Sequence, residues 1–369
     1  GLYKAIEVQA PDKYDISDSI YYFGIGASKE GITGNALAVT KAQLEEIKVF
    51  SIERTNDDGY IISGAFEGTI DIGDYNVKET ENGSNGGIIV KYNSKGEVEW
   101  VSSITGELAQ IAYSVIQNEN GEYIGTGACD SFGDLIQLSA TITDAANNIK
   151  TVQYEYMGSR IIIKYNMNGE LLWAKEEGKS GGYSVPESLV KGDNNSFFIS
   201  ENGNVTKYDS NGEVVWDKIL NNYSFINSPA IHTEDGGIIV AKNFVNKVYV
   251  ENHYFLSNGE NDEVIIKYNT NGEVEYATLI AGDSVDVITS LVSTSDGGLI
   301  VTGYFESSSI IVGEYTLNGN GKEVGMIIKY NSEGEVEWAT STPVSIESIV
   351  ETENGEYIAI GNYSGNVTI

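Results

Sequence analysis

The sequence predicts an all-β repeat protein, and three observations carry this prediction. Its 369 residues include 42 glycines and 24 tyrosines beside only 4 prolines, a balance typical of many strands joined by tight turns. A ten-residue phrase that ends in an aromatic residue occurs in five copies. A second phrase with its own turn lies between these copies, so the repeated unit contains two hairpins.

The ten-residue phrase predicts one β-hairpin in each repeat. An apolar strand leads into each copy, a turn follows, and alternating polar and apolar residues lead to the aromatic end. The copies are residues 91–100, 164–173, 207–216, 267–276 and 329–338. The turn glycine is expected to adopt the left-handed backbone of a type I turn followed by a bulge. It is found at Gly96, Gly169, Gly212, Gly272 and Gly334.

The second phrase predicts another hairpin, a strand, a tight turn and a strand. Its versions are residues 51–64, 114–124, 188–198, 230–238, 290–299 and 348–357. Two hairpins per repeat give four antiparallel strands, which we call a, b, c and d in chain order. Four such strands make up one blade, so we expect a β-propeller of four-stranded antiparallel blades. A solenoid is the competing architecture, but it predicts shorter and more even repeats.

The number of blades is six or seven, and we prefer seven within a single domain, residues 1–369. The approximate blades are then 1–50, 51–105, 106–178, 179–220, 221–280, 281–342 and an incomplete 343–369. In the six-bladed alternative, the c and d strands near the N-terminus complete the last blade. Residues 1–35 are then an extension.

Composition excludes several classes of partner. With 22 basic and 54 acidic residues the formal net charge is −32, a field that repels phosphate backbones and anionic lipid headgroups. Nucleic acid is therefore not an expected partner. No stretch approaches about 18 consecutive apolar residues, so membrane insertion is not expected either. The single cysteine excludes an intrachain disulfide, and the sequence does not predict an oligomeric state.

One pair of motifs resembles a known family. Residues 296–305 (DGGLIVTGYF) and 327–331 (IIKYN) are similar to the bacterial surface β-propeller repeats described as SBBP-like. The resemblance covers residues 51–363 and departs furthest at 185–216, where the DGG turn is missing. It implies a propeller on an exported or surface-attached bacterial protein, hence an extracellular or cell-surface location. It implies no catalytic residues.

Strand order predicts which face of the blades binds a partner. In such a blade the a–b and c–d turns emerge on one face, and the b–c and d–a connections emerge on the other. The b–c connections are long and variable, which is where recognition usually resides on a rigid scaffold. They are residues 67–86, 130–158, 243–262 and 306–325. Three of them contain stretches that predict extra hairpins, at 69–75, 247–254 and 310–315.

Tyrosines in these connections are the candidate contacts to a protein or glycan ligand. They are Tyr75, Tyr154, Tyr156, Tyr254 and Tyr315. The recurring tryptophans are instead expected to pack between neighbouring repeats, because they occupy the same strand site in every copy.

The sequence predicts no cofactor, and calcium is the one metal considered. Acid pairs that could supply oxygen ligands are Asp71 with Asp74 and Asp130 with Asp134. Glu260, Asp262 and Glu263 form a third acidic group. None follows the calcium-loop pattern, and solvated loop acids are the alternative.

Catalytic patterns are missing as well. The two histidines, His232 and His253, have no metal-binding spacing, and no nucleophile set or phosphate-binding motif is present. We therefore predict a noncatalytic surface protein for binding or adhesion. The alternatives are a polysaccharide-acting enzyme with acids at the central channel, or a structural spacer of a longer surface protein.

Overall fold

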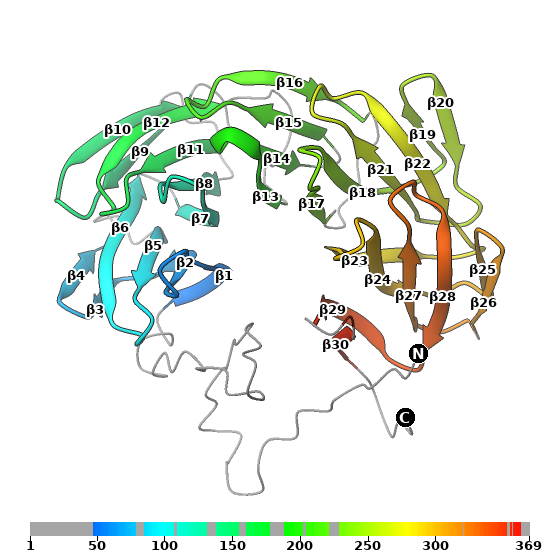
Figure 1. Cartoon of the computed structure of the whole chain (residues 1–369). Helices are drawn as coiled ribbons and strands as arrows, with labels where there is room; N and C mark the ends of the chain where they lie inside the picture. Colours follow the sequence, from blue (N-terminus) through cyan, green and yellow to red (C-terminus); the bar gives the residue numbers. More distant parts are fainter. Residues whose placement is uncertain are drawn as a thin grey trace, which may run out of the picture. The chain divides into compact units, whose positions relative to one another are not determined.

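The computed structural model describes residues 47–78, 85–106, 109–130, 138–154, 160–177, 188–201, 204–220, 229–319, 321–352, 355 and 357–362. These residues are almost entirely β-strands and turns, with one short 3₁₀ turn at Asp193–Asn195 (Figure 1). They divide into two compact units. The N-terminal unit holds the described residues before 197 together with 209–212, and the C-terminal unit holds 197–208 and 213–362.

Two sheets make up most of the N-terminal unit. The first contains β1 (Ile47–Arg54), β2 (Tyr60–Phe66), β5 (Gly86–Tyr92) and β6 (Val98–Gly106), paired antiparallel in that order. The second contains β7 (Ala109–Gln117), β8 (Tyr123–Asp130), β11 (Arg160–Tyr165) and β12 (Leu171–Glu177). Both follow the order a, b, c, d that the sequence predicts.

The later sheets repeat this order. One contains β13 (Ser188–Lys191), β14 (Phe197–Glu201), β15 (Asn204–Tyr208) and β16 (Val214–Lys218). The next contains β17 (Ala230–His232), β18 (Ile238–Phe244), β21 (Asp262–Tyr268) and β22 (Val274–Ile280). The one after it contains β23 (Asp286–Ser293), β24 (Leu299–Phe305), β27 (Val324–Tyr330) and β28 (Val336–Thr342). β29 (Ser345–Glu351) and β30 (Tyr357–Asn362) form a final pair. Four-stranded antiparallel sheets are thus confirmed.

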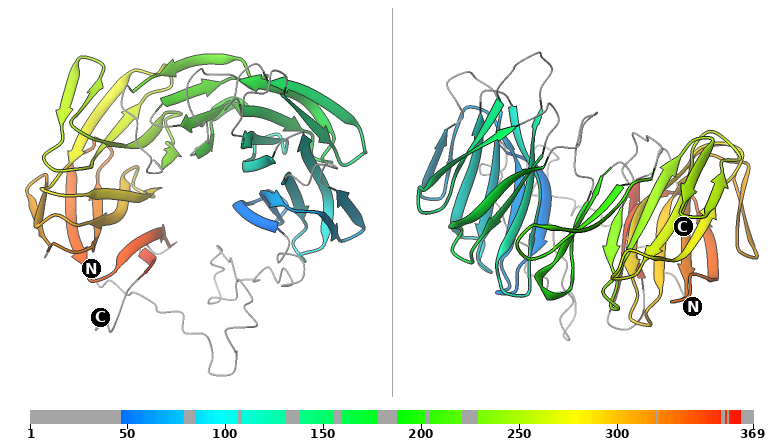
Figure 2. Two further views of the ribbon diagram at one scale, coloured as in Figure 1. Left: turned by 180° about the vertical axis from the view of Figure 1, so that it is seen from behind. Right: turned by 90° about the horizontal axis from the view of Figure 1, so that it is seen from above.

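Three b–c connections fold into two-stranded hairpins, as the sequence predicts. They are β3 (Thr69–Ile72) with β4 (Tyr75–Lys78), β19 (Lys247–Val250) with β20 (His253–Leu256), and β25 (Ser309–Val312) with β26 (Tyr315–Asn318). Figures 1 and 2 show each as a separate small ribbon beside the sheet from which it comes.

Two stretches differ from what the sequence predicts. The longest b–c connection contains two strands that the sequence does not predict, β9 (Leu138–Thr143) and β10 (Ile149–Tyr154), and they extend the first sheet because β9 pairs with β6. Residues 47–50 are not the end of an N-terminal copy, because β1 runs continuously through them and pairs with β2. A β-bulge at Phe50 interrupts the alternation of inward and outward residues, so the sequence pattern does not show the strand there. Residues 1–46 lie outside the described residues.

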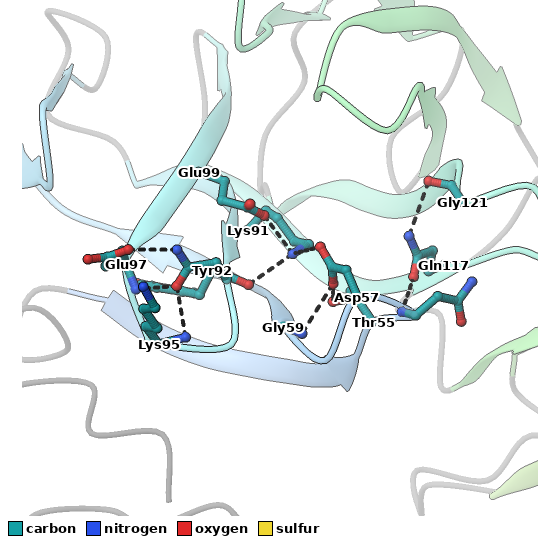
Figure 3. A network of polar contacts seen from close by, with 12 residues as sticks. Thr55, Asp57, Gly59, Lys91, Tyr92, Lys95, Glu97, Glu99, Gln117 and Gly121 are labelled. Atoms are coloured by element: carbon teal, nitrogen blue, oxygen red, sulfur yellow. Dashed lines mark hydrogen bonds and ion pairs between the residues drawn. The ribbon is translucent and has the colours of Figure 1, made fainter. Parts of the chain in front are cut away.

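The lysine of the recurring phrase joins the two hairpins of its sheet. Lys91 is buried, and its Nζ lies 2.9 Å from Asp57 Oδ2 in the a–b turn and 2.7 Å from Glu99 Oε2 on strand d (Figure 3). Burial opposes ionisation of Asp57, but hydrogen bonds from Lys91, Thr55 and Gly59 outweigh it and lower its pKa to about 2. Lys329 makes the same pair of contacts with Asp296 and Glu337.

In the first four copies of the phrase, the final aromatic residue packs on the turn glycine of the next copy. Gly169 has φ +77°, and a methyl group there would lie 2.5 Å from Trp100 Cδ2. The same contact joins Trp173 to Gly212, Trp216 to Gly272 and Tyr276 to Gly334. The glycine is therefore required twice, for its left-handed backbone and for the ring that lies on it. This confirms the predicted packing between neighbouring repeats for Trp100, Trp173 and Trp216.

Candidate functional site

The three insertion hairpins share one scaffold, which permits a direct comparison of their faces. In each, alternate residues of the first strand turn inward and are buried. The inward set is Ile70, Ile72 and Val77 in the first, Val248 and Val250 in the second, and Ile310, Val312 and Leu317 in the third. Since these inward residues make the apolar contacts, the outward residues of the hairpins are free to differ.

The outer face of the β19–β20 hairpin is aromatic. Tyr249 pairs directly with Tyr254, and Lys247 pairs with Leu256 on the same face. The two tyrosines are 52% and 60% exposed, and Leu256 is 56% exposed. We call Lys247, Tyr249, Tyr254 and Leu256 the tyrosine face.

The geometry of the tyrosine face forms a small platform. The two ring centroids lie 6.3 Å apart with the planes inclined by 54°. Lys247 Nζ lies 4.7 Å from the centroid of Tyr249 and 5.9 Å from that of Tyr254, close enough for cation–π attraction to both. The platform thus combines exposed ring surface with an ammonium group that can donate hydrogen bonds.

The other two hairpins carry different residues at the same positions. Asp71 and Asn76 stand in place of the tyrosine pair on β3–β4, where the Asn76 amide donates to Asp71 Oδ1 at 2.7 Å. Ile311 and Thr316 stand there on β25–β26. The hairpin fold therefore does not require two tyrosines, and their presence on β19–β20 needs another cause.

The turn of the β19–β20 hairpin also differs from the other two. The first turn residue is glycine in the other hairpins, Gly73 with φ +57° and Gly313 with φ +58°. Here it is Glu251 with φ +50°, a backbone region that costs a non-glycine residue roughly 1–2 kcal/mol. Its carboxylate lies 3.3 Å from Lys218 Nζ on β16. The ion pair connects the hairpin tip to strand d of the preceding sheet.

A cluster of buried polar side chains fastens the root of the same hairpin. It comprises Asn243 at the end of β18, Asp262 and Glu263 at the start of β21, Asp286 at the start of β23, and Ser307. Asn243 Nδ2 and the Ile288 N–H donate to Glu263 Oε1, at 3.1 Å and 3.3 Å. The Ser307 hydroxyl donates to Asp286 Oδ1 at 2.8 Å. We call this set the root cluster.

The root cluster joins three connections. Asp262 accepts hydrogen bonds from the N–H groups of Asn258, in the β20–β21 connection, and Gly282, in the β22–β23 connection. Asp286 reaches the β24–β25 connection through Ser307. In the first sheet the register positions of Asp262 and Glu263 are held by Gly86 and Gly87. The first sheet therefore lacks the two carboxyl groups that β21 contributes to the cluster.

Two carboxyl groups of the root cluster favour the protonated form. Burial raises the pKa of Glu263 to about 8. Burial also raises the pKa of Asp286, and the neighbouring Asp262 adds to the shift. Among the described residues, nothing donates a hydrogen bond to Glu263 Oε2 or Asp286 Oδ2, which agrees with neutral carboxyl groups.

This arrangement does not provide a metal centre or an accessible acid pair. Asp262, Glu263 and Asp286 are at most 1% exposed, so they cannot touch a substrate in this conformation. The described part of the chain contains no group of three or more His, Cys, Asp or Glu residues placed to hold a metal ion. The chemistry it offers is contact through the exposed rings, held on a rigid root.

The predicted tyrosines are placed in different environments. Tyr254 is on the tyrosine face. Tyr75 and Tyr315 are half-buried, and their hydroxyls donate to the backbone carbonyls of Glu99 and Glu337 on strand d, at 3.0 Å and 2.6 Å. These hydroxyls therefore bond within the fold, whereas the sequence predicts contacts to a ligand.

The remaining predicted residues are buried, dispersed or outside the described residues. Tyr154 is 7% exposed and donates to Gln110 Oε1 at 2.8 Å, so it packs in the core where the sequence predicts a rim contact. Asp71 is bound to Asn76, and Asp74 is exposed in the hairpin turn. Tyr156, Asp134 and the side chain of Asp130 lie outside the described residues.

Sequence reasoning missed Tyr249 and most of the root cluster. Tyr249 and Tyr254 are equally far from the two-residue turn at 251–252, which makes them a cross-strand pair. That symmetry was a usable signal. Asp262 and Glu263 were noticed as loop acids, whereas Asp286 belongs to the next sheet and carries no local signal.

Within the described residues, no helix is long and apolar enough to cross a membrane.

Comparisons with known proteins give no family. No family model matches the sequence, and no curated protein matches it. The resemblance to the surface repeat family therefore stays a prediction.

Solved structures give distant similarities. A protein of unknown function from Bacteroides caccae is 12% identical with a TM-score of 0.31, covering 74% of this chain and 92% of that chain. A catalytically inactive virginiamycin B lyase from Staphylococcus aureus with quinupristin is 12% identical with a TM-score of 0.34, covering 83% and 89%. PorZ, a surface component of the type-IX secretion system of Porphyromonas gingivalis, is 8% identical with a TM-score of 0.32, covering 85% and 54%. Scores this low establish neither a shared fold nor a shared activity.

Proposed function

We propose that this chain is a noncatalytic, secreted or cell-surface binding protein that recognises a protein or glycan through its b–c connections. The tyrosine face of β19–β20 is the contact surface. The proposal rests on a comparison of the three equivalent hairpins. Only β19–β20 has an exposed tyrosine pair at these positions. The other two hairpins have Asp71 with Asn76 and Ile311 with Thr316 there. Exposed tyrosines supply large contact area at low entropic cost.

The proposed architecture is a propeller of seven blades. Support comes from the a, b, c, d order of the antiparallel sheets and from the aromatic-on-glycine contact between successive copies. The enzyme alternative receives no support from the root cluster, because its carboxyl groups are buried. The extracellular location follows from the resemblance of residues 296–305 to surface repeats.

The test is adhesion of the purified chain to extracellular glycoprotein preparations such as mucin. Tyr249→Ala with Tyr254→Ala should abolish adhesion. Ile311→Ala, which removes an equally exposed apolar side chain from the equivalent hairpin site, should leave it unchanged. Adhesion that survives loss of both tyrosines would refute the assignment of this face, and no specific adhesion of the unaltered protein would favour a structural spacer.

A further inference from the structure

The size, charge and chemistry of the tyrosine face restrict what it can bind. Its four side chains project from one face of a ten-residue hairpin, Lys247 to Leu256. The ligand class can therefore be argued from the area and the functional groups of this small surface.

The area is too small for a stable protein interface by itself. A fully buried aromatic side chain covers about 150–250 Å², so these half-exposed side chains offer on the order of 400 Å². A specific protein interface needs about 800 Å² on each partner. A protein partner would have to extend well beyond the hairpin, whereas an oligosaccharide of a few rings would not.

The functional groups suit a sugar. Each tyrosine offers a ring face that packs against the apolar C–H face of a pyranose, and a hydroxyl that both donates and accepts hydrogen bonds. Lys247 Nζ, within 6 Å of both ring centroids, can donate to sugar hydroxyls that lie at the edge of the rings. The inclination of 54° between the rings presents two faces to one bent or branched ligand.

The charge favours a neutral sugar over an acidic one. The formal net charge of −32 repels an anionic glycan at long range, and one lysine on the face does not offset it. A neutral oligosaccharide approaches without this cost.

The root of the hairpin is preorganised for such a ligand. The buried hydrogen bonds of the root cluster anchor the base of the hairpin, and the Glu251–Lys218 ion pair adds a surface contact at its tip. Preorganisation lowers the entropic cost of binding, which matters most for small, weakly bound ligands.

We infer that the tyrosine face binds a short neutral oligosaccharide by ring stacking; this inference rests on the proposed binding role of the hairpin. Tyr249 and Tyr254 provide the stacking surfaces, and Lys247 provides the polar anchor.

The experiment is titration of the full chain with three probes, followed by two-dimensional NMR or calorimetry. The probes are neutral cello-, xylo- and manno-oligosaccharides, anionic oligogalacturonides, and a mucin preparation stripped of its glycans. We expect binding of a neutral probe, an affinity loss of about tenfold or more for Tyr249→Ala or Tyr254→Ala, and near-normal affinity for Tyr254→Phe, which keeps the ring. Ile311→Ala should bind as the unaltered protein does.

The other outcomes distinguish failure of the sugar inference from failure of the proposed function. Tyrosine-dependent binding to stripped mucin without binding to any oligosaccharide would overturn the sugar inference and leave the proposed function standing. Preferred, salt-sensitive binding of oligogalacturonides would overturn the neutral class. Oligosaccharide binding that both alanine variants retain would overturn this site, and no tyrosine-dependent binding to any probe would remove both proposals.

Discussion

Replacing Glu263 by glutamine should change the pH dependence of stability in the C-terminal unit. The substitution keeps the shape of the side chain and the acceptor oxygen that Asn243 and the Ile288 N–H contact, but it removes the titrating group. Because burial raises the folded-state pKa from 4.5 to about 8, the folded chain keeps a proton that the unfolded chain releases. This contribution to stability is fully present below the unfolded pKa and is lost as the pH rises towards 8.

The magnitude follows from that window. Each pH unit between the two pKa values is worth about 1.4 kcal/mol, so the unaltered protein loses roughly 3–4 kcal/mol through Glu263 between pH 5 and pH 8. Glu263→Gln escapes this loss. The difference in free energy of unfolding between the variant and the unaltered protein should therefore shift in favour of the variant by roughly 3–4 kcal/mol from pH 5 to pH 8.

Urea denaturation at pH 5, 6.5 and 8, followed by tryptophan fluorescence and circular dichroism, measures this difference. Glu260→Gln is the matched control, because it removes the same charge from an exposed position three residues away in the sequence. If the free energies of unfolding of Glu263→Gln and of the unaltered protein differ by the same amount at all three pH values, Glu263 does not titrate as described.

Two further substitutions test the repeat itself. Gly169→Ala should lower the free energy of unfolding by about 2–4 kcal/mol, since it strains a left-handed backbone and places a methyl group against Trp100. Gly121 has nearly the same φ, but a methyl group there would have its nearest neighbours at 3.7 Å. Gly121→Ala should therefore lower the free energy of unfolding by only about 1–2 kcal/mol in the same urea titration. Equal losses of stability for the two variants would contradict the ring contact. Lys91→Met should cost about 1–3 kcal/mol because it leaves two carboxylates without their shared cation, whereas exposed Lys95→Met should change stability by less than about 0.5 kcal/mol. A similar effect of the two lysine substitutions would contradict the bridging role of Lys91.

Local sequence patterns were sufficient to predict the hairpins and the repeat. Gly96, Gly169, Gly212, Gly272 and Gly334 all have the positive φ that their place in the phrase predicts. These features depend on residues within one turn, so they can be recognised without knowing the rest of the fold. The same holds for the three insertion hairpins, whose alternation and central turn are local.

Longer-range pairings could not be predicted. Nothing in residues 138–154 indicates that β9 leaves its own repeat to pair with β6, because an edge strand accepts any partner of suitable length. Glu263 meets Ile288 and lies near Asp286 through the packing of two sheets, so sequence spacing alone does not predict the root cluster. The burial of Tyr154 could not be predicted for the same reason, since it depends on contact with the distant Gln110.

We propose that the repeating residues build the scaffold and that one non-repeating face carries the recognition. A reciprocal graft between two hairpins separates these two roles. Lys247→Ser, Tyr249→Ile, Tyr254→Thr and Leu256→Asn give β19–β20 the outer residues of β25–β26, and the four reverse substitutions transfer the tyrosine face to Ser309, Ile311, Thr316 and Asn318.

The measurement is binding of the neutral oligosaccharide probe by calorimetry, with thermal unfolding as the check on folding. We expect the first graft to lose binding, the reverse graft placed on it to restore binding at the new hairpin, and both to unfold near the temperature of the unaltered protein. Full binding by the first graft, with its tyrosine face removed, would show that recognition does not depend on this face.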